Sequence, residues 1–192
     1  MLYLTVILAV SALVILFNSL PELSAGLLLS NATAVALGVA AVIIIDGTEA
    51  LIIRRLLPSK IFSPDKKLFR VCRAEHNFYN KLGIKHWKDK VPELGIFTGF
   101  DKGNIKSTSD REYLSRFLLE ANFGVVIHIV NAGTGFLIAA LPLCSSPYIW
   151  LPIFITNLVL SLLPVFILRY NTHILYRLYL RSKRATTERS PE

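Results

Sequence analysis

Four long apolar runs dominate the sequence and limit the folds that it can adopt. Each run reaches the roughly 20 residues that a helix needs to cross a hydrocarbon core of about 30 Å. A chain of 192 residues, 53% of them hydrophobic, is too small to hide four such helices in a soluble core. The runs are Met1 to about Leu20, Ala25 to Ile45 with an extension to Ile53, Ala121 to Leu143, and Tyr148 to Leu168. We therefore predict an all-α polytopic membrane protein, one membrane domain of four transmembrane helices in two hairpins.

The connections between the runs define this hairpin organisation. Two short tips, NSLPELSAG and LPLCSSPY, carry proline, whereas the polar insert at 54–118 is long. The first run lacks a basic n-region and its apolar stretch starts almost at residue 2, so we expect a retained helix rather than a cleaved signal peptide.

The basic residues indicate an orientation. All 21 Lys and Arg lie in two places, 15 between Arg54 and Arg116 and 6 between Arg169 and Arg189, and the hairpin tips have none. By the positive-inside rule the insert and the tail at 169–192 are cytoplasmic. We predict a multi-pass protein of the cell membrane with both termini in the cytoplasm. Its net charge of +8 suits membrane lipids and acidic substrates, and we expect no nucleic acid partner because no recognition fold is found.

The insert contains a helical pattern with a carboxylate on its apolar face. Its basic, proline-interrupted start suits a position at the lipid headgroups, so we expect an interfacial helix and loop. From Lys66 to Leu82 apolar residues recur at helical spacing, and Glu75 lies in the middle of that face. Either Glu75 reaches a nearby Lys or Arg, or it is held at the membrane boundary for a function. Farther on, STSDREYLSRFLLE places cap residues before a further helix, with Glu112 in its first turn.

The third run carries a stripe of polar and small residues. Ionisable groups inside a membrane are costly, by around 2.5 to 3.5 kcal/mol at its centre, so each one is a candidate site. The stripe consists of Glu120, Gly124, His128, Asn131 and Gly135. Two interpretations are left open: the stripe packs against neighbouring helices, or His128, oriented by Glu120, acts as a base on a hydroxyl group.

Two carboxylates lie near the inner end of the second run. We expect Asp46 and Glu49 to form ion pairs with Arg54, Arg55 or the tail. The chain offers these carboxylates too few companions for a metal site.

The motifs of the insert and of the last two runs resemble one family of membrane enzymes. The motifs are YNKLGIKHWKDKVPE, YLSRFLLEANFGVVIH and LPVFILRYNTHIL, between about Glu75 and Leu175. They are similar to the small integral-membrane glycosyl-4,4'-diaponeurosporenoate acyltransferases, which place a fatty acyl group on the sugar of a glycosylated carotenoid. The most specific part of the resemblance is WKDKVP, and the RYN that follows the last run comes next.

This resemblance implies an acyltransferase that moves a fatty acyl group onto a hydroxyl of a glycosylated lipid or carotenoid-like acceptor at the inner leaflet. The co-substrate would be an acyl donor, either acyl-CoA or another acyl carrier, with no bound cofactor and no metal. His128, supported by Glu120, would take the proton of the acceptor hydroxyl, and Glu75 is the alternative base. Asp89 would orient or assist.

The same resemblance assigns further residues to substrate binding. Lys88 and Arg169 would hold anionic groups of the donor, with Tyr170 and Asn171 beside Arg169. Trp87 would anchor the loop at the interface or stack on a sugar. If instead Arg169 is taken without the resemblance, it is either a snorkelling anchor or a binding group for a phosphate or carboxylate.

Two places depart from the pattern of the family. His86 stands before the tryptophan where the family usually has Arg or Lys, so we assign it no catalytic role. Thr172 and His173 replace the Arg-Pro that often follows RYN, and the acceptor is therefore left open, as is the oligomeric state.

A non-enzymatic role is the alternative interpretation. In that case the polar stripe packs a helix and the basic insert docks on lipid or protein, as in a lipid-binding, transport or partner subunit. A membrane methyltransferase would share the size and the basic tail, but its expected C-terminal Arg and paired Glu arrangement is not found. Convergence on one pocket would favour the enzyme, and the residues that decide it are Glu75, Asp89, Glu120, His128 and Arg169.

Overall fold

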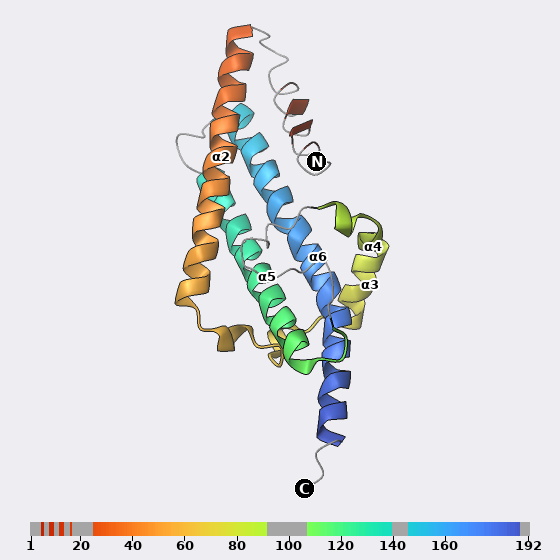
Figure 1. Cartoon of the computed structure of the whole chain (residues 1–192). Coiled ribbons are helices and arrows are strands. Elements are labelled where there is room, and N and C mark those ends of the chain that lie inside the picture. Colours follow the sequence, from red (N-terminus) through yellow and green to blue (C-terminus); the bar gives the residue numbers. More distant parts are fainter. Residues whose placement is uncertain are drawn as a thin grey trace. The chain divides into compact units, whose positions relative to one another are not determined.

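The computed structural model describes residues 25–91, 107–139 and 146–188, together with a few positions before residue 17. The described residues form helices and turns and contain no strand, which confirms the all-α prediction. The α-helices are α2 (Ala25–Leu56), α3 (Arg73–Lys81), α4 (Ile84–Trp87), α5 (Arg111–Ala139) and α6 (Pro147–Glu188) (Figure 1). Three short 3-10 turns, η2 (Ser59–Phe62), η3 (Lys67–Phe69) and η4 (Lys88–Lys90), belong to the insert.

Three of the helices are long and apolar enough to cross a membrane. These segments are Gly26–Leu56, Arg111–Leu137 and Ile149–Ala185, with mean hydropathies of 2.3, 1.3 and 2.3. They correspond to the second, third and fourth predicted spans. The first predicted span, residues 1–20, falls almost entirely outside the described residues.

α5 begins ten residues before the predicted start of the third span at Ala121. Asp110 caps the helix, because its Oδ1 accepts hydrogen bonds from the backbone N–H groups of Glu112 at 2.9 Å and Tyr113 at 3.1 Å. The cap predicted from the sequence is therefore confirmed. The span extends farther than its apolar run because the polar first turns continue the same helix.

α6 is much longer than the apolar run that predicted it. The helix has 42 residues and continues twenty residues past Leu168, so the predicted tail at 169–192 is largely helical. Its length of about 63 Å is twice what the hydrocarbon core requires. The extension holds because Leu175 and Tyr179, both almost fully buried, pack against α5.

α3 is shorter than the helical pattern over Lys66 to Leu82. Cys72 caps its start, with Sγ accepting from the N–H of Glu75 at 3.4 Å. Gly83 ends the helical conformation after α3, because its φ of 65° is a left-handed conformation that glycine adopts without steric cost. At its other end α3 begins only at Arg73, so Leu68 precedes the helix and is not part of its buried face. Leu68 is 78% exposed.

The chain divides into two compact units, each built from separate segments. The first unit consists of Met1–Ile53 and Ile127–Leu163, and the second of Arg54–Val126 and Pro164–Glu192. α5 and α6 each contribute residues to both units. The prediction of one membrane domain is not tested by this division and stays a prediction.

In the first unit, α2 packs on α6 through apolar side chains, and polar groups also link its helices. Val35 and Val42 of α2 contact Ile153 of α6 in a buried cluster. Glu49 accepts a hydrogen bond from Thr134 of α5 at 2.6 Å, in place of the ion pair that the sequence suggested.

α5 and α6 approach closely at Gly135 within this unit. The amide of Asn157 donates to the backbone oxygen of Asn131 at 3.2 Å, and a Cβ on Gly135 would collide with the Asn157 side chain. Asn131, with its amide oriented to satisfy its neighbours, donates to Glu49 Oε2 at 3.0 Å. Asn131 and Gly135, the last two residues of the polar stripe, therefore serve helix packing.

In the second unit, the insert is anchored on both long helices. Leu114, Phe117 and Leu118 of α5 pack against Leu175 and Tyr179 of α6. A second cluster joins α3 and α4 to α6 and consists of Tyr79, Ile84, Ile167 and Tyr170. In η2, the ring of Phe62 stacks on Phe123 with 3.8 Å between centroids, and its backbone oxygen accepts from Asn122 at 2.9 Å.

We predict that Gly135→Ala lowers the thermal unfolding temperature of the purified protein, because the new methyl group must displace the Asn157 amide. Gly133→Ala is the matched control, since a Cβ there meets nothing within 4 Å. Both changes raise helix propensity by about 1 kcal/mol, so their difference reports the contact. Equal unfolding temperatures for the two variants would contradict the close approach.

Candidate functional site

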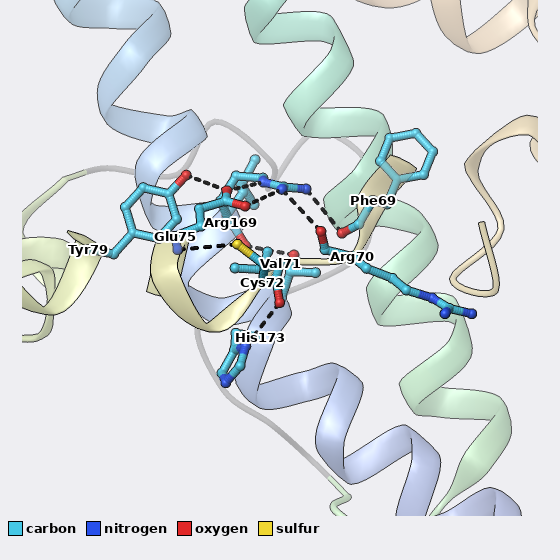
Figure 2. Close-up of polar contacts among 10 residues, drawn as sticks. Phe69, Arg70, Val71, Cys72, Glu75, Tyr79, Arg169 and His173 are labelled. Atoms are coloured by element: carbon cyan, nitrogen blue, oxygen red, sulfur yellow. Dashed lines mark hydrogen bonds and ion pairs between the residues drawn. The ribbon is translucent and has the colours of Figure 1, made fainter. Parts of the chain in front are cut away.

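An ion pair between α3 and α6 forms the centre of the polar site in the second unit (Figure 2). Arg169 donates from Nε to Glu75 Oε1 and from Nη2 to Glu75 Oε2, both at 2.8 Å, in a bidentate arrangement. The side chains of Arg169 and Glu75 are 14% and 27% exposed. The hydroxyl of Tyr79 also donates to Glu75 Oε1, at 2.7 Å. We call Glu75, Tyr79 and Arg169 the Glu75–Arg169 cluster.

The remaining donors of Arg169 hold the extended segment that precedes α3. Nη1 donates to the backbone oxygen of Phe69 at 3.0 Å, and Nη2 reaches that of Arg70 at 3.4 Å. One turn farther along α6, His173 Nδ1 contacts the backbone oxygen of Val71 at 3.3 Å (Figure 2). Side chains of α6 thus satisfy carbonyls that have no helical or sheet partner.

Local sequence explains why these groups meet. Glu75 lies in the first turn of α3, and Tyr79 follows at i+4 on the same helical face. The turn at Gly83 then directs Ile84, which is fully buried, back against α6. Trp87 packs on the apolar cluster that contains Ile84. Its indole N–H donates to the backbone oxygen of Leu82 at 3.1 Å, which closes the turn.

The environment sets the charge of the cluster. Burial alone would raise the pKa of Glu75, but hydrogen bonds from Arg169 and Tyr79 and the charge of Arg169 outweigh it and lower this pKa. Burial and the bond to the Glu75 carboxylate raise the pKa of Tyr79 to about 12. At neutral pH the cluster is therefore a carboxylate held by a guanidinium and a neutral phenol, and Glu75 is a weak base.

The residues of the WKDKVP motif divide between the core and the surface. Trp87 is partly buried in the cluster around Ile84, as described above. Asp89, in η4, is 83% exposed, and its only ion pair among the described residues is with its neighbour Lys88 at 3.4 Å. Pro92, the last residue of the motif, lies outside the described residues.

Glu120 is held by an arginine at the end of α2. Arg54 Nη2 lies 2.9 Å from Glu120 Oε2, and the guanidinium also sits over the ring of Phe123 at 5.3 Å. Arg54 was expected to meet Asp46 or Glu49 instead. His128 follows eight residues later on α5 and belongs to the first unit, so its predicted pairing with Glu120 stays a prediction.

The RYN motif also separates by burial. Arg169 belongs to the Glu75–Arg169 cluster, whereas Tyr170 is only 7% exposed and packs against Ile84. Asn171 is half-buried. Of the nine predicted site residues, the structure thus brings Glu75 and Arg169 into direct contact.

Two histidines of the second unit were not identified as site residues from the sequence. The rings of His76 and His173 stack with 4.0 Å between centroids, and His76 also stacks on Tyr170 at 5.3 Å. A signal for them existed, because His76 follows Glu75 and His173 lies at i+4 from Arg169. Once Glu75 and Arg169 pair, these two histidines are brought together.

A sequence model of the family described as glycosyl-4,4'-diaponeurosporenoate acyltransferase matches residues 58–181. This range is more than half of the 192 residues. The chain belongs to this family. Neither the curated proteins nor the solved structures give a match.

The range that matches the glycosyl-4,4'-diaponeurosporenoate acyltransferase family contains the whole Glu75–Arg169 cluster. It also includes η4, the described part of α5 and α6 as far as position 181. α2 lies outside it, and with it Arg54, the partner of Glu120. The resemblance noted from the sequence is therefore confirmed, and it centres on the second unit.

We predict that Glu75→Gln lowers the free energy of unfolding by roughly 1–3 kcal/mol at neutral pH, because Arg169 loses its charged partner. The pKa of Glu75 is lower in the folded protein than its ordinary value of 4.5. This contribution is therefore complete above pH 4.5 and is lost as the pH falls through the folded pKa. Thermal unfolding of native protein and variant across this pH range measures it.

The control for this experiment is Glu112→Gln, which removes an exposed carboxylate from the first turn of α5. Its effect on unfolding should be small, within about 0.5 kcal/mol. A stability difference for Glu75→Gln that did not shrink in acid, or that equalled the control, would contradict the assigned charge state.

Proposed function

We propose that this chain is a membrane acyltransferase that moves a fatty acyl group onto a hydroxyl of a glycosylated lipid or carotenoid-like acceptor at the inner leaflet. The observation that carries the proposal is the family match over residues 58–181, which contains the Glu75–Arg169 cluster. The three helices of sufficient length and apolarity support a membrane location.

The proposed reaction forms one ester bond and breaks one bond of the donor. The acceptor hydroxyl oxygen attacks the acyl carbonyl carbon, and the bond from that carbon to the leaving group of the donor breaks. The proton of the hydroxyl ends on the leaving group, for example a thiolate if the donor is a thioester such as acyl-CoA. A base is needed to move this proton, and no cofactor is required.

We propose His128 as the base. The neutral imidazole of a histidine has a ring nitrogen that can accept a proton from a hydroxyl group. Glu75, the alternative, is less suited because its pKa is lowered and Arg169 and Tyr79 already bind its oxygens. The geometry supports a positioning role for Glu75, since its pair with Arg169 ties the insert to α6.

The residues of the insert are proposed to meet the substrates. Asp89 and Lys88 lie in η4, where the Asp89 carboxylate is exposed and accessible to a polar acceptor or donor. The packing of Trp87 supports the anchoring role rather than stacking on a sugar. Four of the five N–H groups of Arg169 are already used by Glu75 and two carbonyls, which leaves Lys88 as the better supported partner for an anionic donor group.

We predict that His128→Ala lowers the rate of acyl transfer by about a hundredfold or more, the usual contribution of a general base. Asp89→Ala should lower it less. The measurement uses purified protein in detergent, labelled acyl donors and a membrane glycolipid extract. His86→Ala, at an exposed position, is the matched control and should retain native activity.

The outcomes of this assay separate the two functions. Equal transfer by native protein and both variants would remove His128 and Asp89 from the mechanism. No transfer by the native protein with any donor offered would favour the non-enzymatic lipid-binding alternative.

The inner-leaflet assignment predicts the accessibility of two cysteines. Cys72 is exposed and has a free thiol, and on the proposed topology it lies in the cytoplasmic insert. Cys144 would lie at the external hairpin tip. In intact cells a membrane-impermeant maleimide should label the Cys72→Ser variant and leave the Cys144→Ser variant unlabelled until the membrane is permeabilised. The reverse pattern would place the insert outside.

A further inference from the structure

An open pocket of about 230 Å³ lies in the second unit, between α3 and the C-terminal half of α6. It is lined by His76, His173, Ile174, Arg177, Leu178 and Arg181. Pockets for drug-sized ligands usually measure about 300–1,000 Å³. This one is therefore too small for a complete acyl donor, but it has room for a phosphate and the atoms next to it.

Two arginines give the pocket an uncompensated positive charge. Arg177 and Arg181 are spaced i, i+4 on α6, so their side chains are neighbours on one face and repel each other. Both are exposed, and among the described residues no carboxylate pairs with either. Lys183, by contrast, reaches Asp65 at 3.4 Å. A bound anion would relieve the repulsion between the two guanidinium groups.

Two imidazoles, those of His76 and His173, line the same pocket. His173 is held by the backbone oxygen of Val71, and its ring stacks on His76. Nδ1 of His76 is buried and lacks a hydrogen-bond partner among the described residues. Burial, followed by the charges of His173 and Arg177, lowers the pKa of His76, so this ring is neutral at neutral pH and offers the pocket a hydrogen-bonding nitrogen rather than a charge.

The rest of the lining is apolar, and on the predicted topology, in which the last span ends at Leu168, the pocket would lie at the membrane boundary. Ile174 and Leu178 face it together with the aliphatic stems of the arginines. Positions 173–181 extend about 8–20 Å past Leu168, the end of the apolar run, at 1.5 Å per residue. This depth is reached by lipid headgroups on one side and by a soluble acyl donor on the other.

We propose that this pocket binds the phosphate group of an anionic amphiphile, with Arg177 and Arg181 as its ionic partners. Guanidinium groups bind phosphate oxygens through paired, charge-assisted hydrogen bonds, and the apolar wall contacts the adjoining carbon atoms of the ligand. The phosphate belongs either to a membrane lipid or to the acyl donor. The second case rests on the proposed acyltransferase function, whereas binding itself is measured without turnover.

The test measures the binding of two probes to the full-length protein in an uncharged detergent. Coenzyme A supplies phosphate from solution, and phosphatidylglycerol supplies it from a lipid. We expect native protein to bind at least one probe, and the double variant Arg177→Gln/Arg181→Gln to bind it about tenfold or more weakly. Replacing both residues with lysine keeps the charge and should cause a smaller loss.

The matched control is Arg73→Gln/Arg184→Gln, which removes two exposed positive charges outside the pocket. It should retain native affinity, and thermal unfolding checks that all variants are folded. The probe whose binding is lost in the pocket variant identifies the source of the phosphate. The proposal is overturned if native protein binds neither probe, or if pocket and control variants lose affinity equally, because the attraction would then be diffuse. An inactive enzyme that still shows the pocket-specific loss would reject the proposed function and not this site.

Discussion

The second unit depends on one charge pair at the boundary between apolar and polar sequence. A guanidinium and a carboxylate, each largely removed from water, are stable there only because each satisfies the other and their remaining positions are used as well. Glu75 accepts from Arg169 and Tyr79, and Arg169 also binds two backbone oxygens. This one contact fixes the start of α3, the extended segment before it and the face of α6 that they share.

The family resemblance acquires a physical meaning through this pair. The motifs of the insert and the RYN that follows the last apolar run are almost a hundred residues apart in the sequence, yet Glu75 from one and Arg169 from the other make two hydrogen bonds. Two aromatic residues beside them, the partly buried Trp87 and the buried Tyr170, pack in the cluster that joins the insert to α6. Asp89, by contrast, is exposed in η4 and takes no part in this packing.

Sequence reasoning predicted local features well and long-range partners poorly. Spacing, charge and hydropathy predicted the cap at Asp110 and the three described spans. They also marked Glu75 and Arg169 as candidate site residues. Periodicity shows which face of a helix is buried but not what covers it. Arg54 was therefore expected among the partners of Asp46 and Glu49, and in fact it meets Glu120. Hydropathy likewise ended the last span at Leu168, because it does not detect the packing of tyrosines and widely spaced leucines that continues α6.

The uninterrupted length of α6 makes spacing itself a constraint on this chain. Arg169, His173, Arg177 and Arg181 follow one another at intervals of four residues and form a single ridge along the helix. A substitution removes one member of this ridge and leaves the others in place. Deleting one residue from 170–176 would instead rotate everything after it by about 100° and separate the ion pair from the two outer arginines. The ridge therefore tolerates exchange of its side chains far better than any change in the number of residues between them.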